Sequence, residues 1–257
     1  PSLRADVRFV LKATDRPTDS QRCRVNMQNS HYKVLSLAQA LNLQLDPWAW
    51  LLGDKLPEAS KGSRVQLTTR KWTLAEYQKL SEIGLLAENE RIELIQGDIV
   101  AKTPVDPLHA NAVAQANSRL VGVFGATHNL RVQLPLQIGA NSEPEPDFCL
   151  IPLAWAQQLT RERRHPDRAD LVIELSNTSL AYDRGPKSSL YASAQIPFYW
   201  EVDLRGERVE VFSEPVVDVQ SPFGWSYYAL RRHRRGERLE FEGRSVSVDD
   251  FLPPNEE

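Results

Sequence analysis

Two short apolar segments with embedded acidic residues constrain this chain most. Asp147 leads into the apolar run 148–151, and Glu174 lies inside the second run, 171–175. Both runs are bounded by turn-forming residues and rich in large or β-branched side chains, which predicts buried strands. A carboxylate in a buried strand is costly unless something compensates its charge. With Lys187 nearby, the two acids suggest a site where a hard cation meets a reacting anion.

The composition is that of one globular domain with a smaller appendage. The chain has 257 residues, of which 41% are hydrophobic and 25% charged. Its 31 basic and 34 acidic residues give a net charge of −3, so a nucleic-acid partner would have to meet a local basic patch. Two cysteines are too few for a disulfide framework or a thiolate metal site. With no apolar run long enough for a membrane span and no signal-peptide core, we expect a cytoplasmic protein without a membrane partner.

The beginning of the chain differs from the rest. Residues 1–30 are polar and patternless, and we expect a disordered or non-native leader there. Residues 31–66 predict a short helical extension, with capping-box spacing from Ser36 to Gln39, followed by a linker at 53–63. The apolar face of this extension is expected to dock on the main domain or on a second subunit. The main domain is expected to span residues 67–257.

The main domain alternates irregularly between helices and strands. Helices are expected from the capping box at Thr73 to Gly84, over 107–125, and from Pro186 in a first helical turn through Ala194. Strands are expected at 91–95 and 98–100, joined by a glycine turn, and at 131–138, 148–151, 171–175, 198–202, 208–212, 225–230, 238–241 and 245–248. This order predicts an α/β (mixed α+β) domain with a mainly antiparallel sheet and no regular βαβ repeat.

Four short motifs, taken together, resemble a known family. They are the segments around Glu93 (91–97), Asp147 (145–147), Glu174 (172–176) and Lys187 (183–187, followed by Tyr191). In this order they resemble the putative restriction endonuclease family of the PD-(D/E)XK nuclease superfamily, over roughly residues 73–212. The resemblance implies a restriction-endonuclease-like central mixed sheet flanked by helices. It also implies a divalent-metal-dependent endonuclease that hydrolyses phosphodiester bonds, with double-stranded DNA the expected substrate.

The resemblance assigns the acidic residues to a metal site. Asp147 would be the central metal ligand, Glu174 the second acidic ligand and the backbone carbonyl of Leu175 a third oxygen donor. Glu93 would contribute a further carboxylate to the metal and catalytic site. Carboxylates, a carbonyl and waters are the donors that Mg²⁺ accepts, so Mg²⁺ or Mn²⁺ is the expected cofactor.

The lysine is where the sequence departs from the superfamily signature. Ser176 stands at the signature position, and the resemblance implies that the catalytic lysine has moved to Lys187 on the following helix. In a helix's first turn the macrodipole would disfavour this cation by about 0.3–1 kcal/mol, which a nearby carboxylate or phosphate would offset. Asp183 is expected to cap that helix and orient Lys187.

Each assignment has a non-catalytic alternative. Taken alone, Glu93 fits a surface strand, Glu174 fits a structural ion pair, and His109, near a helix start, fits a surface histidine. The second candidate function is a catalytically idle nucleic-acid-binding or scaffold protein with the same fold. A metal-independent hydrolase with paired carboxylates ranks third, because nothing in the sequence indicates a sugar cleft.

Arginine clusters are the candidate contacts with a phosphate backbone. The first contains Arg161, Arg163, Arg164 and Arg168, the second contains Arg231, Arg232, Arg234 and Arg235, and Arg184 is a further candidate near the expected site. A solvated charged face is the alternative for each cluster. Phosphate neutralisation requires several of them on the same side as the carboxylates. The sequence leaves open the recognition site, DNA versus RNA, and whether the protein is a monomer or a homodimer.

Overall fold

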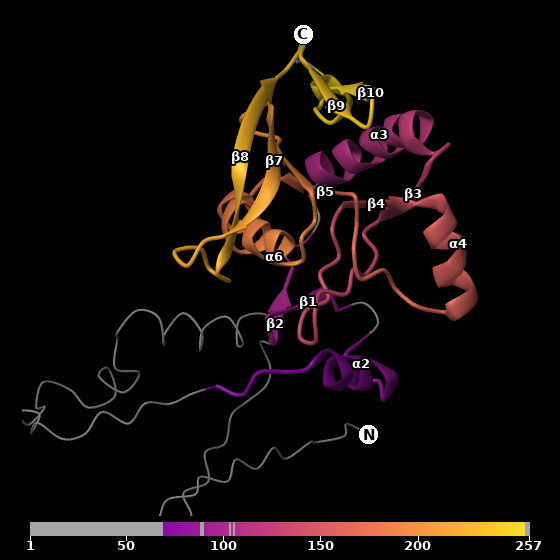
Figure 1. The fold of residues 1–257 in the computed structure, drawn as a ribbon, viewed down its shortest axis with the longest axis vertical. Coiled ribbons are helices and arrows are strands. Elements are labelled where there is room, and N and C mark those ends of the chain that lie inside the picture. The colour runs from indigo at the N-terminus through magenta and orange to yellow at the C-terminus, as the bar shows by residue number, and fades with distance from the viewer. Residues whose placement is uncertain (1–68, 88–89, 103, 105, 255–257) are drawn as a thin grey trace, which may run out of the picture. The chain divides into compact units, whose positions relative to one another are not determined.

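The computed structural model describes residues 69–87, 90–102, 104 and 106–254 (Figure 1). The expected leader, helical extension and linker of residues 1–66, and the expected domain boundary at 67, lie outside the described residues. Within the described part of the chain, no helix combines the length and the apolar character needed to cross a membrane.

A six-stranded mixed sheet forms the centre of the domain. Its spatial order is β3-β4-β5-β6-β7-β8, and only the β5–β6 pair is parallel. The strands are β3 (His128–Val132), β4 (Phe148–Pro152), β5 (Leu171–Ser176), β6 (Phe198–Asp203), β7 (Arg208–Val217) and β8 (Trp225–Arg234). The predicted mixed α+β fold, with a central mixed sheet flanked by helices, is confirmed.

The two faces of this sheet bury alternate residues of its strands. Leu171 and Ile173 face α3 (Pro107–Phe124) and the ladder of β9 (Arg238–Phe241) and β10 (Arg244–Ser247). Val172 packs on the opposite face, with α4 (Leu153–Glu162) and α6 (Ser188–Ser193). Burial on both faces explains why β5 reads as a continuous apolar run. The alternation also directs Glu174 to the α6 face, where its charge needs a partner.

The starts of α2 and α3 each have a side-chain cap. Thr73 Oγ1 accepts a hydrogen bond from Glu76 N, and the Glu76 carboxylate accepts one from Thr73 N, so both halves of the predicted capping box are present at α2 (Leu74–Glu82). Asp106 caps α3 by accepting from His109 N at 3.1 Å. This cap fixes His109 in the first turn of α3.

The predicted hairpin, β1 (Ile92–Ile95) and β2 (Asp98–Ala101), forms a ladder separate from the central sheet. Its turn places Gln96 and Gly97 at φ 50° and 80°, the left-handed pair that a tight hairpin requires. Glu143 N donates to Leu94 O at 2.7 Å, joining the hairpin to the segment that leads into β4. This contact brings Glu93 towards Asp147.

The predicted strand 131–138 is wrong in its position. β3 begins at His128 and ends at Val132, where Gln133 turns the chain with φ 49°. Leu136 and Ile138 have buried side chains, but they lie in a loop and not in a strand. Their apolar side chains produced the strand-like pattern, whereas Pro135, having no N–H group, cannot donate within a ladder.

The predicted helix start at Pro186 is also wrong. The helix begins six residues earlier, with α5 (Leu180–Tyr182), and passes through a π-helical segment (Asp183–Lys187) before α6. Proline lacks the N–H for the normal helical hydrogen bond, and a π-bulge is one way for a helix to accommodate it. The strands at 238–241 and 245–248 are present as β9 and β10 but form their own ladder instead of extending the central sheet.

Candidate active site

Four of the residues selected from the sequence converge on one cavity of about 280 Å³. Glu93, Asp147, Glu174 and Lys187 all line it, and their exposed fractions are 2%, 6%, 5% and 4%. They come from β1, the residue before β4, β5 and the end of the π-helical segment. Burial this deep means that each charge must be compensated within the site.

The register of β4 and β5 places Asp147 beside Glu174. Phe148 pairs with Ile173, so the next step of this antiparallel ladder brings the two acids together. Asp147 N donates to Glu174 Oε2 at 3.2 Å, and Leu175 N donates to Asp147 Oδ2 at 2.9 Å. In a strand the N–H and C=O of one residue point to the same neighbour, so the Leu175 carbonyl is also directed to this side.

Lys187 connects the acids of two different elements. Its Nζ lies 2.9 Å from Glu174 Oε1 and 3.0 Å from Glu93 Oε2. Tyr191, one turn later on α6, donates to the same Glu174 oxygen at 2.6 Å. Because the helix starts at Leu180, Lys187 is not in its first turn, and the expected dipole penalty does not apply.

Asp183 does not cap this helix, contrary to the sequence interpretation. It lies inside the continuous α5–α6 helix, so its side chain cannot reach free N–H groups at a helix start. Its Oδ2 instead accepts hydrogen bonds from Ser176 Oγ at 2.6 Å and Ser179 Oγ at 2.5 Å. Ser176, at the signature-lysine position, therefore binds the helix that carries Lys187.

Two neighbours of Asp147 were not selected as site residues from the sequence. His109 Nε2 lies 3.1 Å from Asp147 Oδ1, and Gln133 Nε2 donates to the same oxygen at 3.0 Å. The interpretation of His109 as a surface residue is wrong, because it lines the cavity and only 16% of its side chain is exposed. The Asp106 cap three residues earlier was the one local signal that fixed its position on α3. Nothing local indicated which strand it would face.

Lys102 is a further residue of the site that was not selected from the sequence, and it contacts Glu93 instead of Asp147. It follows β2, and its Nζ lies 3.0 Å from Glu93 Oε1 and donates to the Glu145 carbonyl at 3.0 Å. Glu93 Oε1 also accepts from Glu145 N at 2.8 Å. The hairpin therefore supplies both an acid and a cation to the site.

Burial and neighbouring charges act against each other on the three acids. Burial opposes ionisation of Asp147, but hydrogen bonding and charge from His109 outweigh it and lower the pKa of Asp147. Burial likewise opposes ionisation of Glu93, where Lys187 and Lys102 prevail and lower its pKa. Burial raises the pKa of Glu174 to about 7, with Lys187 opposing the shift and Asp147 adding to it. Glu174 is thus the acid whose charge is least compensated.

The pKa values of the two basic side chains, Lys187 and His109, are both raised by the neighbouring acids. Burial favours the neutral form of Lys187, but Glu174 and Glu93 outweigh it and raise the pKa of Lys187 well above its ordinary value. The hydrogen bond to Asp147 raises the pKa of His109 against the effect of burial. The site therefore holds Lys187 as a cation beside an under-compensated carboxylate.

The donor set fits a hard divalent cation. Asp147, Glu174 and the Leu175 carbonyl present oxygens at the point where the β4–β5 ladder ends, next to a cavity that can hold waters. Mg²⁺ prefers such oxygen donors and keeps several waters. Glu93 is directed to Lys187 and Lys102, so its assignment as a ligand stays a prediction.

A sequence model of the Uma2 family, described as putative restriction endonuclease, matches residues 74–242. The chain belongs to this family. The resemblance to putative restriction endonucleases expected from the motifs is therefore confirmed. A solved structure from Anabaena variabilis ATCC 29413, titled a putative nuclease belonging to DUF820, is similar over 70% of this chain and 96% of that chain. The TM-score is 0.50 at 16% identity, so this likeness supports the restriction-endonuclease-like fold. No curated protein sequence matches the chain.

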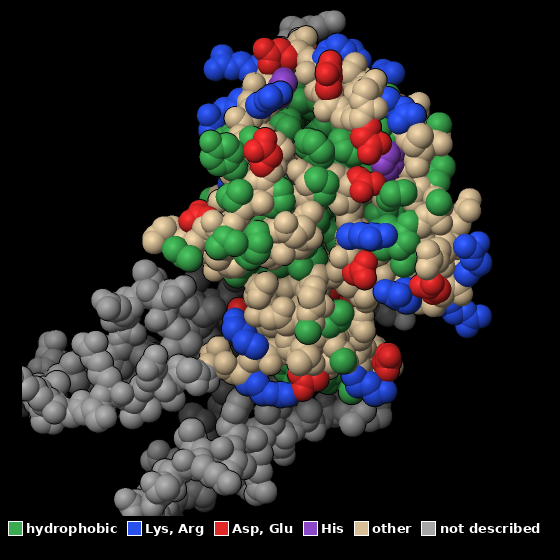
Figure 2. Space-filling model, in the orientation of Figure 1, with side chains coloured by type: hydrophobic (Ala, Val, Ile, Leu, Met, Phe, Trp, Pro, Cys, Tyr) green, Lys and Arg blue, Asp and Glu red, His purple; other side chains and the backbone are tan. Residues whose placement is uncertain are grey.

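In this Uma2-family chain, the first arginine cluster lies at the end of α4, away from the cavity lining. Arg163 is the left-handed C-cap of α4, and Arg164 pairs with Glu162 and Asp167. Figure 2 shows Lys and Arg side chains mixed with Asp and Glu, with several gathered at the edge that α4 forms in Figure 1. A role in DNA binding for Arg161, Arg163 and Arg164 stays a prediction.

Arg184 lies among acids. Its Nε is 2.8 Å from Glu210 Oε2 and 3.4 Å from Glu201 Oε2, and its Nη2 is 3.4 Å from Asp203 Oδ2. These pairs link the π-helical segment to β6 and β7. A DNA contact would have to compete with them, so that role also stays a prediction.

Proposed function

We propose that this protein is a divalent-metal-dependent endonuclease that cleaves double-stranded DNA, with Mg²⁺ or Mn²⁺ at Asp147 and Glu174. One observation carries the proposal: Lys187 lies buried against Glu174, next to Asp147, inside a cavity lined by further polar groups. Family membership supports the choice of a nuclease. The roles below follow from the contacts of each side chain.

Asp147 and Glu174 would hold the ion, with the Leu175 carbonyl as a third donor. A bound divalent ion supplies Lewis acidity and lowers the pKa of a bound water. Gln133 and His109 both contact Asp147 Oδ1 and orient this carboxylate. Such outer contacts fix the geometry of the ligands that they touch.

Lys187 would stabilise charge on the reacting phosphate. An ammonium has three donor hydrogens, and Glu93 and Glu174 accept two of them at 3.1 and 2.9 Å. The third is left for a phosphate oxygen or for the attacking water. Because the ammonium is held by two carboxylates, it is positioned before substrate binds, and preorganised charge is what accelerates such a reaction.

The alternative, an idle nucleic-acid-binding or scaffold protein, is favoured by a specific observation. Lys187, Lys102 and His109 already pair with the three acids, so the cluster is partly compensated without an ion. Under this alternative the ion pairs would be structural. The two functions differ in whether metal changes anything measurable.

A cleavage assay on supercoiled circular DNA separates them. We expect nicked and linear products with Mg²⁺ or Mn²⁺ and none with a chelator, since a circle can be opened only by internal cleavage. Single-stranded DNA and RNA, assayed in parallel, test the substrate assignment. Glu174→Gln should abolish cleavage, whereas the exposed Glu240→Gln should retain it. Intact circles at every metal concentration would favour the idle protein.

A further inference from the structure

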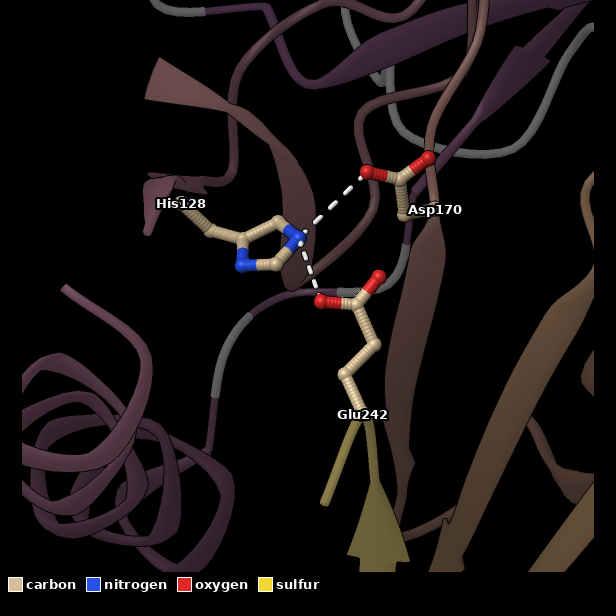
Figure 3. A group of neighbouring side chains, drawn as sticks. All are labelled: His128, Asp170 and Glu242. Atoms are coloured by element: carbon tan, nitrogen blue, oxygen red, sulfur yellow. Dashed lines mark ion pairs between the residues drawn. The ribbon is translucent and has the colours of Figure 1, made fainter. Parts of the chain in front are cut away.

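A second group of metal-binding side chains lies at the other end of β5 from Glu174. It consists of His128, the first residue of β3; Asp170, immediately before β5; and Glu242, in the turn between β9 and β10. Figure 3 shows the three side chains pointing towards one another from different segments. Along a strand that rises about 3.3 Å per residue, Asp170 and Glu174 are separated by about 13 Å. The group is therefore distinct from the candidate active site.

The separations suit a shared ion better than direct hydrogen bonds. His128 Nε2 lies 3.3 Å from Asp170 Oδ2 and 3.6 Å from Glu242 Oε2, and the donor atoms of all three lie within 4.8 Å of one another. Charge-assisted N–H···O bonds are shorter, at about 2.7–2.9 Å. Donors bound tetrahedrally at about 2.0–2.2 Å lie about 3.3–3.6 Å apart, which matches the spacing from His128 Nε2 to each of the two carboxylates.

The surroundings of His128 leave Nε2 available as a ligand. Thr127 Oγ1 donates to the Phe124 carbonyl at 3.2 Å and accepts from Arg244 Nη1 at 2.8 Å. When the Thr127 proton points to the Phe124 carbonyl, the 2.9 Å contact with His128 Nδ1 is donated by the ring. The imidazole then carries its proton on Nδ1 and directs the lone pair of Nε2 at the two carboxylates. Metal-binding histidines are usually oriented by such a hydrogen bond.

The imidazole is also held in place by packing. His128 is only 4% exposed, and its ring lies 5.7 Å from that of Phe241, the residue before Glu242. Glu242 and Gly243 form the tight turn, at φ 48° and 71°. An ion bound here would fasten the separate β9–β10 ladder to β3 and to the start of β5.

We propose that His128, Asp170 and Glu242 bind one Zn²⁺ ion that clamps the β9–β10 hairpin to the central sheet. A neutral imidazole with two carboxylates carries a charge of −2, which the ion neutralises. An imidazole donor favours Zn²⁺ over Mg²⁺, the opposite preference to that of the oxygen donors at Asp147. The side chains of Asp170 and Glu242 are 37% and 50% exposed, which leaves an entry path and room for a water as fourth donor.

The test measures Zn²⁺ binding to the full-length chain carrying Asp147→Asn, which removes the proposed active-site metal. After treatment with a chelator, we expect one Zn²⁺ per chain by calorimetric titration and a higher melting temperature with Zn²⁺. Glu242→Gln or Asp170→Asn should weaken Zn²⁺ association at least tenfold. Both positions are partly exposed, so these variants should fold. Glu240→Gln, an exposed acid on the same hairpin, should bind within twofold of its parent.

Three results would overturn the proposal: no Zn²⁺ binding to the Asp147→Asn chain, unchanged affinity in either ligand variant, or displacement of Zn²⁺ by equimolar Mg²⁺. Because the readout is zinc binding, not DNA cleavage, failure here leaves the proposed nuclease function standing. Conversely, a protein that binds Zn²⁺ as described but cleaves no DNA would support the zinc site and contradict the proposed nuclease function.

Discussion

Lys187 donates a 2.9 Å hydrogen bond to Glu174, and both side chains are almost fully buried. The pair joins β5 to the end of the π-helical segment and places a cation beside the buried carboxylate of β5. Lys187 also contacts Glu93 at 3.0 Å. One ammonium thus compensates two buried carboxylates, which makes it important for stability as well as for the proposed chemistry.

Lys187→Met should therefore destabilise the metal-free protein. The substitution keeps the apolar stem but leaves Glu93 and Glu174 without their shared cation, a loss worth about 3–5 kcal/mol for a buried pair. Mg²⁺ should restore part of this stability by supplying positive charge, while cleavage stays abolished. Urea unfolding with and without Mg²⁺ measures both effects.

Lys79→Met is the matched control for that experiment. Lys79 pairs with Glu82 at 2.9 Å on the surface of α2, with two thirds of its side chain exposed, so its removal should cost less than about 1 kcal/mol. If the Lys187 and Lys79 variants unfold at the same urea concentration, Lys187 does not compensate the buried acids. Normal cleavage by Lys187→Met would also remove its assignment as the displaced catalytic lysine.

His109→Ala should reduce cleavage about 10- to 100-fold, the usual effect of removing a residue that orients a metal ligand. The variant lacks the His109 contact to Asp147 Oδ1 and keeps the one from Gln133. Mg²⁺ affinity should fall with the rate. His165→Ala, at an exposed histidine beyond α4, should change neither quantity. Equal activity of the two variants would show that His109 does not position Asp147.

Much of the fold could be predicted because its signals are local. The capping box at Thr73, the turn at Gln96–Gly97 and the apolar run of β5 each depend on a few adjacent residues, and the structure contains all three elements. The fold and the family could also be predicted, because the order of the motifs around Glu93, Asp147, Glu174 and Lys187 is specific. The strand expected at 131–138 failed because Leu136 and Ile138 are buried by tertiary packing of a loop.

The site could be predicted only in part, for the same physical reason. Burial made Glu174 conspicuous, since a carboxylate in an apolar strand needs a partner. His109, Lys102 and Gln133 have no such local signature, because their importance comes from contacts with residues distant in sequence. The π-helical segment around Pro186 likewise depends on a helix that begins earlier than proline suggests.

Glu201→Gln should flatten the pH dependence of stability. Glu201 is fully buried, and burial raises its pKa to about 8 from 4.5, against the charge of Arg184. A carboxyl with a raised folded-state pKa gives full stability below pH 4.5 and loses it as the pH rises through about 8, by at most about 1.4 kcal/mol per pH unit. Glutamine has no proton to lose.

Melting temperatures from pH 5 to 9 measure this difference. The wild-type protein should lose stability relative to Glu201→Gln from pH 5 to about pH 8, and the difference between them should stay constant above that pH. Glu240→Gln, at an exposed position, should follow the wild-type curve. Parallel curves for wild type and Glu201→Gln would mean that Glu201 is already ionised in the folded protein.

Replacing Arg161, Arg163 and Arg164 together with alanine should weaken DNA binding. The slope of log affinity against log salt should become shallower by about 0.9 for each DNA phosphate that these arginines neutralise. Binding to one duplex at several salt concentrations gives this slope. A parallel variant with Arg231, Arg232 and Arg234 replaced compares the second cluster. If the first variant keeps its affinity and slope, its arginines are solvent-exposed charges without a DNA role.

The most direct test of the proposed metal site is the Mg²⁺ response of wild type and Asp147→Asn, measured as melting temperature beside cleavage of circular DNA. Asparagine can keep the hydrogen bonds with Leu175 and Gln133, because its carbonyl accepts from Leu175 N and the Gln133 amide can reverse, while its NH2 group faces His109 Nε2. Mg²⁺ suits the oxygen donors of this site and not the histidine site. We expect Mg²⁺ to raise the melting temperature of wild type and support cleavage, and to do neither for the folded variant. The assignment would be contradicted if Mg²⁺ left the melting temperature of the wild-type protein unchanged and the protein cleaved no DNA with or without Mg²⁺.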